Sequence, residues 1–268
     1  MKFFKELIRS IIAERGLIYN LAKDDFKLRF AGAKLGVIWG FIQPLITVLL
    51  YWFVFQVGFR SGETSTGLPY VLWLVAGIIP WFFFNEALNG TMTCLYDYNF
   101  LVKKVLFNIK ILPFVKILSA LFVHLFFVDV IFIMFASYGY TVSIYNIQIL
   151  YYLFCEIVLV YAIGLIISSI SVIVKDTIQV VGIVLQIFFW TIPIVWAPEN
   201  IHSPIISRIL KLNPVYYIVE GYRDSFVDHN WVWERGTYTA YFWALVIVLL
   251  IVGSKVFNKL NKYFADML

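Results

Sequence analysis

Long apolar segments separated by short polar ones dominate the hydrophobic pattern of this chain. Six segments have the roughly 20 apolar residues that a helix needs to cross a hydrocarbon core. They lie near residues 36–57, 69–89, 113–137, 147–171, 178–197 and 237–254. The pattern therefore predicts an all-α integral membrane protein with six transmembrane helices.

The first 34 residues show an amphipathic pattern instead. Apolar residues recur three and four positions apart from Phe3 to Ile12, and charged residues occupy the other side. This pattern predicts a helix lying in the plane of the lipid headgroups; a helix packed on a soluble partner is the alternative. The basic residues that we expect to meet headgroups are Lys5, Arg9, Lys27 and Arg29.

The stretch between the fifth and sixth segments is apolar but broken. Its two pieces, residues 204–212 and 214–226, would reach only about 14 and 20 Å as helices, whereas a hydrocarbon core is about 30 Å thick. We expect a re-entrant hairpin that enters from one face and turns back at Asn213-Pro214. Such backbone exists at membrane depth only where protein surrounds it or where it lines a cavity, so the stretch indicates a transport pathway closed at one mouth.

The composition agrees with a multi-pass membrane protein and gives no sign of an enzyme. Apolar residues make up 62% and charged residues 14%, with a mean hydropathy of +0.86; soluble proteins average about 45–50% and 25%. Three scattered histidines and two cysteines form no catalytic or metal-binding pattern, and no P-loop motif occurs. We therefore expect no catalytic residue, no metal and no cofactor in this chain. The charged first thirty residues also predict no cleavable signal peptide.

Lys and Arg residues predict the orientation of the chain. With six spans and both termini cytoplasmic, sixteen of the 21 Lys and Arg residues fall on the inner side. An excess of this kind marks the cytoplasmic face. The five outer ones are Arg60, Arg208, Lys211, Arg223 and Arg235. Arg208, Lys211 and Arg223 could attract an anionic substrate or serve as interfacial anchors.

Four ionisable residues fall within the predicted spans, where each costs roughly 2.5–3.5 kcal/mol on insertion scales. They are Glu86, His124, Asp129 and Glu156. They could form a proton relay or an ion site, but their irregular spacing favours separate interhelical hydrogen bonds. His124 and Asp129 are five residues apart, about 140° around a helix, and are not expected to pair.

Aromatic residues make up 19% of the chain and cluster in two spans. They fit core packing or interfacial belts; the alternative is the lining of a conduit along which a polymer slides. The residues that we expect to line such a conduit are Tyr51, Trp52, Trp81, Phe82, Phe83, Phe84 and Glu86. Residues 90–112 are a cytoplasmic connection that is either a solvated linker or a helix docking on a cytosolic protein.

Short motifs in a fixed order resemble those of polysaccharide-export ABC permeases, and the resemblance covers nearly the whole chain. They are Leu28-Arg29-Phe30, Leu35-Gly36, Trp39 and Pro44 before and in the first span, residues 76–83 (AGIIPWFF) in the second, Lys175-Asp176 and Pro193-Ile194 around the fifth, and Asn213-Pro214 in the outer stretch. Residues 51–55 (YWFVF), 216–223 (YYIVEGYR) and 241–245 (YFWAL) look most like the teichoic acid export permeases of Gram-positive bacteria.

The resemblance implies a type-2 ABC exporter permease in the cytoplasmic membrane. It implies an interface helix and approach segment (1–34) and a six-helix domain (35–268), with a coupling loop (90–112) and re-entrant gate helices (198–226). A homodimer with a conduit between protomers would bind two copies of a cytosolic P-loop ATPase, which holds ATP and Mg. The implied cargo is wall teichoic acid, a polyol-phosphate polymer on polyprenyl diphosphate. The alternative cargo is O-antigen or capsular polysaccharide; a drug exporter or an ion-coupled carrier is less favoured, and no nucleic-acid partner is expected.

The resemblance also implies roles for two sets of residues. ATPase coupling is expected from Asp97, Tyr98, Asn99, Phe100, Lys103 and Lys104, although Lys104 replaces the small residue that some relatives have there. The outer gate is expected to contain Asn213, Pro214, Tyr216, Tyr217, Glu220 and Arg223.

Overall fold

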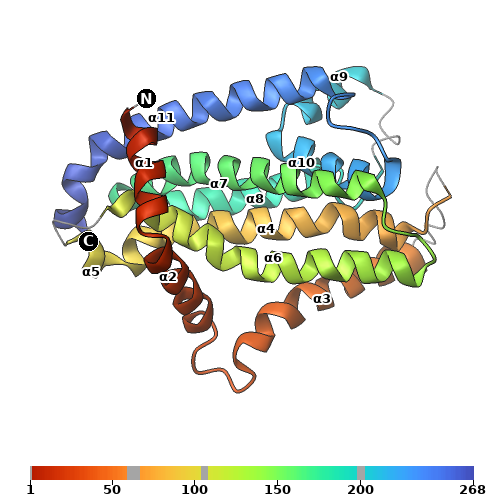
Figure 1. Cartoon of the computed structure of the whole chain (residues 1–268), viewed down its shortest axis with the longest axis horizontal. Coiled ribbons are helices and arrows are strands. Elements are labelled where there is room, and N and C mark those ends of the chain that lie inside the picture. The colour runs from red at the N-terminus through yellow and green to blue at the C-terminus, as the bar shows by residue number, and fades with distance from the viewer. Residues whose placement is uncertain (1, 59–66, 104–107, 198–202) are drawn as a thin grey trace.

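The computed structural model is helical and contains no strand among the residues that it describes (Figure 1). These are residues 2–58, 67–103, 108–197 and 203–268, with side chains in the first helix described at residues 6, 7 and from 9 onward. Within these ranges, five helical segments are long and apolar enough to cross a membrane. They are Gly36–Gly58, Tyr70–Asp97, Ile109–Ser137, Ile144–Ile173 and Gly236–Met267. Each overlaps a span predicted from the sequence.

The remaining predicted span, residues 178–197, is shorter than expected. Helix α8 (Thr177–Thr191) has 15 residues, or about 22 Å at 1.5 Å per residue. It ends because Ile192 has an extended backbone (ψ 136°), the conformation that a following proline, here Pro193, imposes on the residue before it. Residues 192–197 continue as a turn. Helix α8 alone is therefore shorter than a hydrocarbon core about 30 Å thick, and a sixth span stays a prediction.

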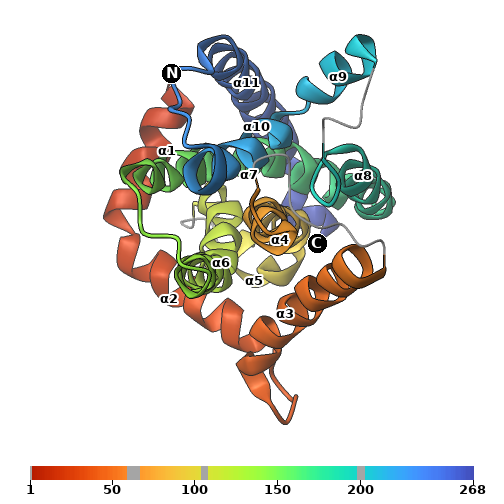
Figure 2. The same cartoon turned by 90° about the vertical axis from the view of Figure 1, so that its right-hand side faces the viewer.

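Helix α4 (Tyr70–Asp97) forms the centre of the bundle, as the end-on view in Figure 2 shows. It packs against α6 (Leu112–Ser137), α7 (Gln148–Ile173) and α10 (Pro214–Arg223). Its buried residues lie all around the helix, as expected for a helix enclosed by others. On one side it is flanked by α8 and by α3 (Trp39–Trp52), which runs between η1 (Gly36–Ile38) and the π-helical turn η2 (Phe53–Gly58).

The N-terminal segment folds as two helices, α1 (Lys2–Ala13) and α2 (Arg15–Leu28). Helix α2 packs against α6 and buries Ile18, Ala22 and Asp25. Both chain termini lie at the same end of the bundle (Figure 1), as the predicted topology requires; which side of the membrane they occupy stays a prediction.

The predicted coupling loop, residues 90–112, is largely helical in its described parts, 90–103 and 108–112. Helix α4 continues through it to Asp97, eight residues beyond the predicted end of the second span. The short helix α5 (Asn99–Val102) and the 3-10 turn η3 (Ile109–Ile111) follow. The connection therefore contains helix, and its docking on a cytosolic protein stays a prediction.

The apolar stretch before the last span contains two short helices, α9 (Pro204–Lys211) and α10. They separate at the predicted position, where the Asn213 side chain accepts a hydrogen bond from the Val215 amide (3.0 Å) and Pro214 begins α10. Helix α10 is buried against α4 and α7, whereas α9 stands apart with Ile205, Ile206 and Ile209 exposed (Figure 2). The π-helical turn η6 (Asp224–Asp228) then leads to α11 (Gly236–Met267), and the depth of this hairpin in a membrane stays a prediction.

Candidate functional site: a groove, a gate and a coupling cluster

A groove of about 410 Å³ lies between α3, α4 and α8. Aromatic rings form much of its wall. The centre of the Phe189 ring lies 5.6 Å from the centre of the Tyr51 ring and 5.7 Å from that of the Trp81 ring. The described residues that line it are Tyr51, Trp81, Asn85, Asn89, Gly182, Leu185, Gln186, Phe189 and Trp190. The groove can therefore present flat apolar faces to a ligand.

Amide side chains add hydrogen-bonding capacity to the groove. Asn85 and Asn89 follow Trp81 at intervals of four residues, which places all three on one face of α4. The side-chain amide of Asn89 donates to the backbone carbonyl of Asn85 (2.7 Å) and to the side-chain oxygen of Asn85 (3.2 Å). Gln186 lines the groove from α8. No charged residue lines the groove within the described ranges. A primary amide both donates and accepts hydrogen bonds, so this lining suits a neutral, hydroxyl-rich ligand.

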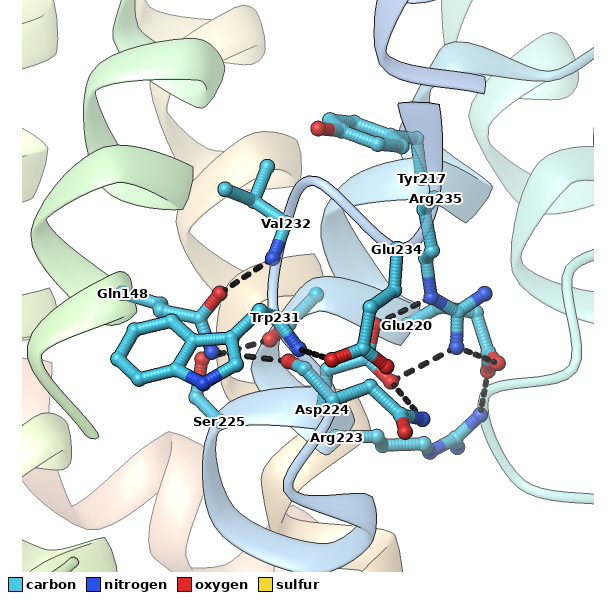
Figure 3. A network of polar contacts seen from close by, with 12 residues as sticks. Gln148, Tyr217, Glu220, Arg223, Asp224, Ser225, Trp231, Val232, Glu234 and Arg235 are labelled. Carbon is cyan, nitrogen blue, oxygen red and sulfur yellow. Dashed lines mark hydrogen bonds and ion pairs between the residues drawn. The ribbon is translucent and has the colours of Figure 1, made fainter. Parts of the chain in front are cut away.

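A buried network of charged residues surrounds the end of α10 (Figure 3). Arg223 is 1% exposed. Its guanidinium donates a hydrogen bond to Glu220 Oε1 (2.8 Å). Arg235, just before α11, lies 3.6 Å from Glu220 Oε2 and donates to Asp224 Oδ1 (2.8 Å). Asn230 also donates to Asp224 Oδ1 (3.0 Å). We call Glu220, Arg223, Asp224 and Arg235 the gate network. It joins α10, η6 and the start of α11.

A second charged cluster lies at the end of the bundle that carries the termini. The Lys116 ammonium on α6 pairs with Asp25 of α2, and also with Asp97 at the end of α4 (2.7 Å). The Tyr98 hydroxyl lies 3.4 Å from Asp25 Oδ1, and its ring centroid lies 5.3 Å from Lys116 Nζ. Burial raises the pKa of the Asp25 carboxyl, but the hydrogen bond and charge of Lys116, with the hydrogen bond of Ser119 and the charge of Arg29, together outweigh burial and hold the pKa below its usual value. The Asp25 carboxylate is therefore charged at neutral pH, and its contribution to stability is lost only as the pH falls through the lowered pKa.

Comparison with known proteins places these features in a family. Residues 16–227 match the family described as ABC-2 type transporter, which covers most of the chain. The chain belongs to this family. It is therefore the membrane permease component of a transporter, and permeases of this family pair with a cytosolic ATPase subunit.

The ABC-2 permease also resembles proteins that are named O-antigen export system permease protein RfbA. It is 24% identical to one from Klebsiella pneumoniae over 255 residues, which cover 94% of this chain and 95% of the relative. It is 24% identical to another from Myxococcus xanthus over 265 residues, which cover 97% and 98%. The similarity therefore extends over whole chains.

The structure separates the residues predicted to line a conduit. Tyr51 and Trp81 line the groove, whereas Trp52 and Phe82 pack half-buried against the core. Phe83 and Phe84 are 2% and 1% exposed and are not among the described residues that line the groove, so a lining role for them stays a prediction. A helix turns by about 100° per residue, so consecutive aromatic residues of α4 cannot all face one groove. Glu86 is paired with Arg29.

Sequence reasoning missed the polar and α8 residues of the groove. These are Asn85, Asn89, Gln186, Phe189 and Trp190. A signal was present in α4, because Trp81, Asn85 and Asn89 recur every four residues in an otherwise apolar helix. In α8 a similar signal was present, because Gln179, Gly182 and Gln186 recur three and four positions apart in an otherwise largely apolar helix.

The predicted gate residues come together around α10. Asn213 and Pro214 form its start, and Tyr216 and Tyr217 are 7% and 5% exposed. The Tyr217 ring stacks on Phe242 of α11 (4.8 Å). These aromatic side chains therefore attach α10 to its neighbours. Arg223 is buried, which contradicts its availability to an anionic substrate; Arg208 and Lys211 are at least partly exposed on α9.

Arg29 is the predicted headgroup residue that the structure places differently. Its guanidinium pairs with Glu86, lies 3.3 Å from Asp25 and donates to Ser119 (3.0 Å), so it joins α2 to α4 and α6. Arg9 and Lys27 are exposed, and the side chain of Lys5 lies outside the described set. Of the predicted coupling residues, Asn99, Phe100 and Lys103 are exposed beside the Lys116 cluster, and Lys104 lies outside the described residues.

The ionisable residues in the spans have different surroundings. His124 forms an interhelical hydrogen bond with the Tyr222 hydroxyl (2.8 Å), and Glu86 forms the ion pair with Arg29. Asp129 is exposed on α6. Glu156 is fully buried, and its carboxylate oxygens have no hydrogen-bond partner among the described residues. The expected interhelical contacts are therefore present for two of the four.

Proposed function

We propose that this ABC-2 permease is the transmembrane subunit of an ATP-driven exporter that moves a lipid-linked polysaccharide of low charge across the cytoplasmic membrane. The groove carries the proposal, because aromatic rings and amides line it without a described charged residue. Aromatic faces pack on the apolar faces of sugar rings, and amides exchange hydrogen bonds with hydroxyl groups. A phosphate-rich polymer would instead be matched by Arg or Lys side chains.

The relatives support the same class of cargo. The two RfbA proteins are named as O-antigen export permeases, so the polysaccharide alternative from the sequence has more support than the teichoic acid that we first expected. A polyol-phosphate polymer is the second candidate. One observation favours it: Arg208 and Lys211 are cations of α9 placed to meet phosphate near the proposed outer mouth.

In the proposed mechanism, two copies of the chain enclose a conduit into which both grooves open. Two copies of a cytosolic ATPase bind ATP and Mg, and contact the permease at Asp97, Tyr98 and the exposed residues of α5. Their closure displaces the end of α4, and the Lys116 cluster passes this movement to α2 and α6. The polymer slides along the aromatic wall, and α9, α10 and η6 close the outer mouth between cycles. Both termini are cytoplasmic in this arrangement, and Arg9 and Lys27 meet the headgroups of the inner leaflet.

The cargo is tested by deleting the gene in its native host and isolating the polyprenyl-linked polymer that accumulates inside the cell. The proposal predicts accumulation of a polymer of sugars with little phosphate, reversed by the wild-type gene. A polymer with one phosphate for each repeating unit would instead establish the teichoic acid alternative. If no lipid-linked polymer accumulates, the proposed function is wrong.

A further inference from the structure

The segment that follows α8 is held in place by a side chain from α10. Arg223 donates through Nη1 to the carbonyl oxygen of Pro193 (2.6 Å) and through Nη2 to that of Ile194 (2.9 Å). The Tyr70 hydroxyl of α4 donates to the next carbonyl, that of Val195 (2.7 Å). Three consecutive backbone carbonyls are therefore bound from α10 and α4. They are carbonyls of a turn, where neither a helix nor a strand satisfies them.

The surroundings of Arg223 fit its guanidinium closely. The guanidinium carbon lies 3.5 Å from the centre of the Trp73 ring, an arrangement that stabilises a cation. Gly77 leaves the space for it, since a Cβ at that position would lie 3.0 Å from the same carbon and closer to Nη2. Glu220 supplies the opposite charge at 2.8 Å. Lysine could not reproduce these contacts, because an ammonium lacks the planar fork that reaches several acceptors and stacks on a ring.

The hydrogen bonds from Arg223 and Tyr70 help to determine the position of α8, which forms one wall of the groove. Phe189 and Trp190, which line the groove, lie only a few residues before the bound carbonyls of Pro193 and Ile194. Within α8, which is described throughout, Leu185 is the one buried residue. The other contacts of α8 with the core are made by half-buried side chains, namely Val181, Phe188 and Phe189. Its position relative to α4 therefore also depends on the segment that Arg223 and Tyr70 hold.

We propose that Arg223 is a positioning residue that joins the wall of the groove to the outer gate, so that α8 and α10 move together. A polymer that enters the groove and displaces Phe189 and Trp190 then pulls on Pro193 and Ile194, and through Arg223 it moves α10. The gate opens when the groove is occupied and stays closed when it is empty. This inference rests on the proposed function, whose groove and gate it connects.

The test uses the full-length permease with its co-purified ATPase in liposomes, without ATP and without polymer. The readout is the release of entrapped radiolabelled sorbitol, which does not depend on the identity of the cargo. Arg223→Lys removes charge-assisted hydrogen bonds that hold the closed gate, so we expect the leak to rise about tenfold to a hundredfold. Tyr70→Phe removes one neutral hydrogen bond from the same segment, and a smaller increase is expected.

The matched control is Arg15→Lys on α2, which changes an exposed arginine outside the groove and the gate and should leave the leak unchanged. If Arg223→Lys folds and stays as tight as the wild type, the link does not exist. If it does not fold, the Tyr70→Phe result decides: an unchanged leak overturns the proposal. A raised leak together with a polymer other than polysaccharide would overturn the proposed cargo and leave the link intact.

Discussion

Replacing Lys116 by methionine is expected to uncouple ATP hydrolysis from export and to destabilise the permease. The Lys116 ammonium binds the carboxylates of Asp25 and Asp97, and its own side chain is 9% exposed. Removing one partner of a buried ion pair costs about 3–5 kcal/mol; Arg29, at 3.3 Å from Asp25, should hold the loss near the lower end. Export should fall by at least about tenfold, the factor that 1.4 kcal/mol represents, while the partner still hydrolyses ATP.

Two further variants separate loss of coupling from loss of folding. Lys23→Met changes a lysine that is exposed on α2; substitutions of exposed residues usually change stability by less than about 0.5 kcal/mol, so stability and export should stay near wild type. The double variant Asp25→Asn with Lys116→Met removes both buried charges, so it should recover stability but not coupling. The measurements are thermal melting in detergent, ATPase rate and export per ATP hydrolysed. Wild-type export per ATP in folded Lys116→Met would remove this cluster from the mechanism.

Opposite charges placed at Gln186 are expected to impair export to a similar degree. Gln186 lines the groove, which has no charged residue among its described lining. Either Gln186→Glu or Gln186→Arg therefore introduces an uncompensated charge into the membrane interior. On insertion scales such a charge costs roughly 2.5–3.5 kcal/mol. A neutral polysaccharide cannot neutralise either charge. Both variants should therefore reduce export by about tenfold or more.

A phosphate-rich cargo predicts a different pair of results. The arginine would attract phosphate and the glutamate would repel it, so the two variants would change export in opposite directions. The measurement is the amount of polymer at the cell surface at equal permease levels. Ile187→Glu is the matched control: it is the next residue of α8, 53% exposed and absent from the groove lining. If export responds to the sign of the charge at Gln186, the low-charge cargo is wrong.

The helices were predictable from the sequence because apolar length alone marks a span. The break at Asn213-Pro214 was predictable as well, since asparagine caps a helix and proline begins one. The end of α8 at Ile192 had a signal in Pro193, but the apolar run across it suggested a longer helix. The face of α4 that meets the groove had a signal in Trp81, Asn85 and Asn89, which recur every four residues. The aromatic run 81–84 gave no such indication, because lipid, protein core and a conduit wall all favour the same apolar residues.

The contacts between distant segments had no sequence signature. Lys116 and Asp25 are 91 residues apart, and nothing local to either one indicates the other. Arg223 binds backbone carbonyls, and a carbonyl acceptor is present at every residue. The sequence was therefore equally compatible with an Arg223 that faces water or headgroups and with the buried positioning residue that the structure contains.

Photo-cross-linking from the groove shows directly whether the polymer passes along it. A photoactivatable amino acid replaces Gln186 in one variant and Ile187 in another, and cells are irradiated while export proceeds. The proposed path through the groove predicts that the permease becomes attached to sugar polymer from position 186 and to lipid or protein from position 187. Polymer attached from position 187 and none from position 186 would contradict it, because the cargo would then pass outside the groove between α3, α4 and α8.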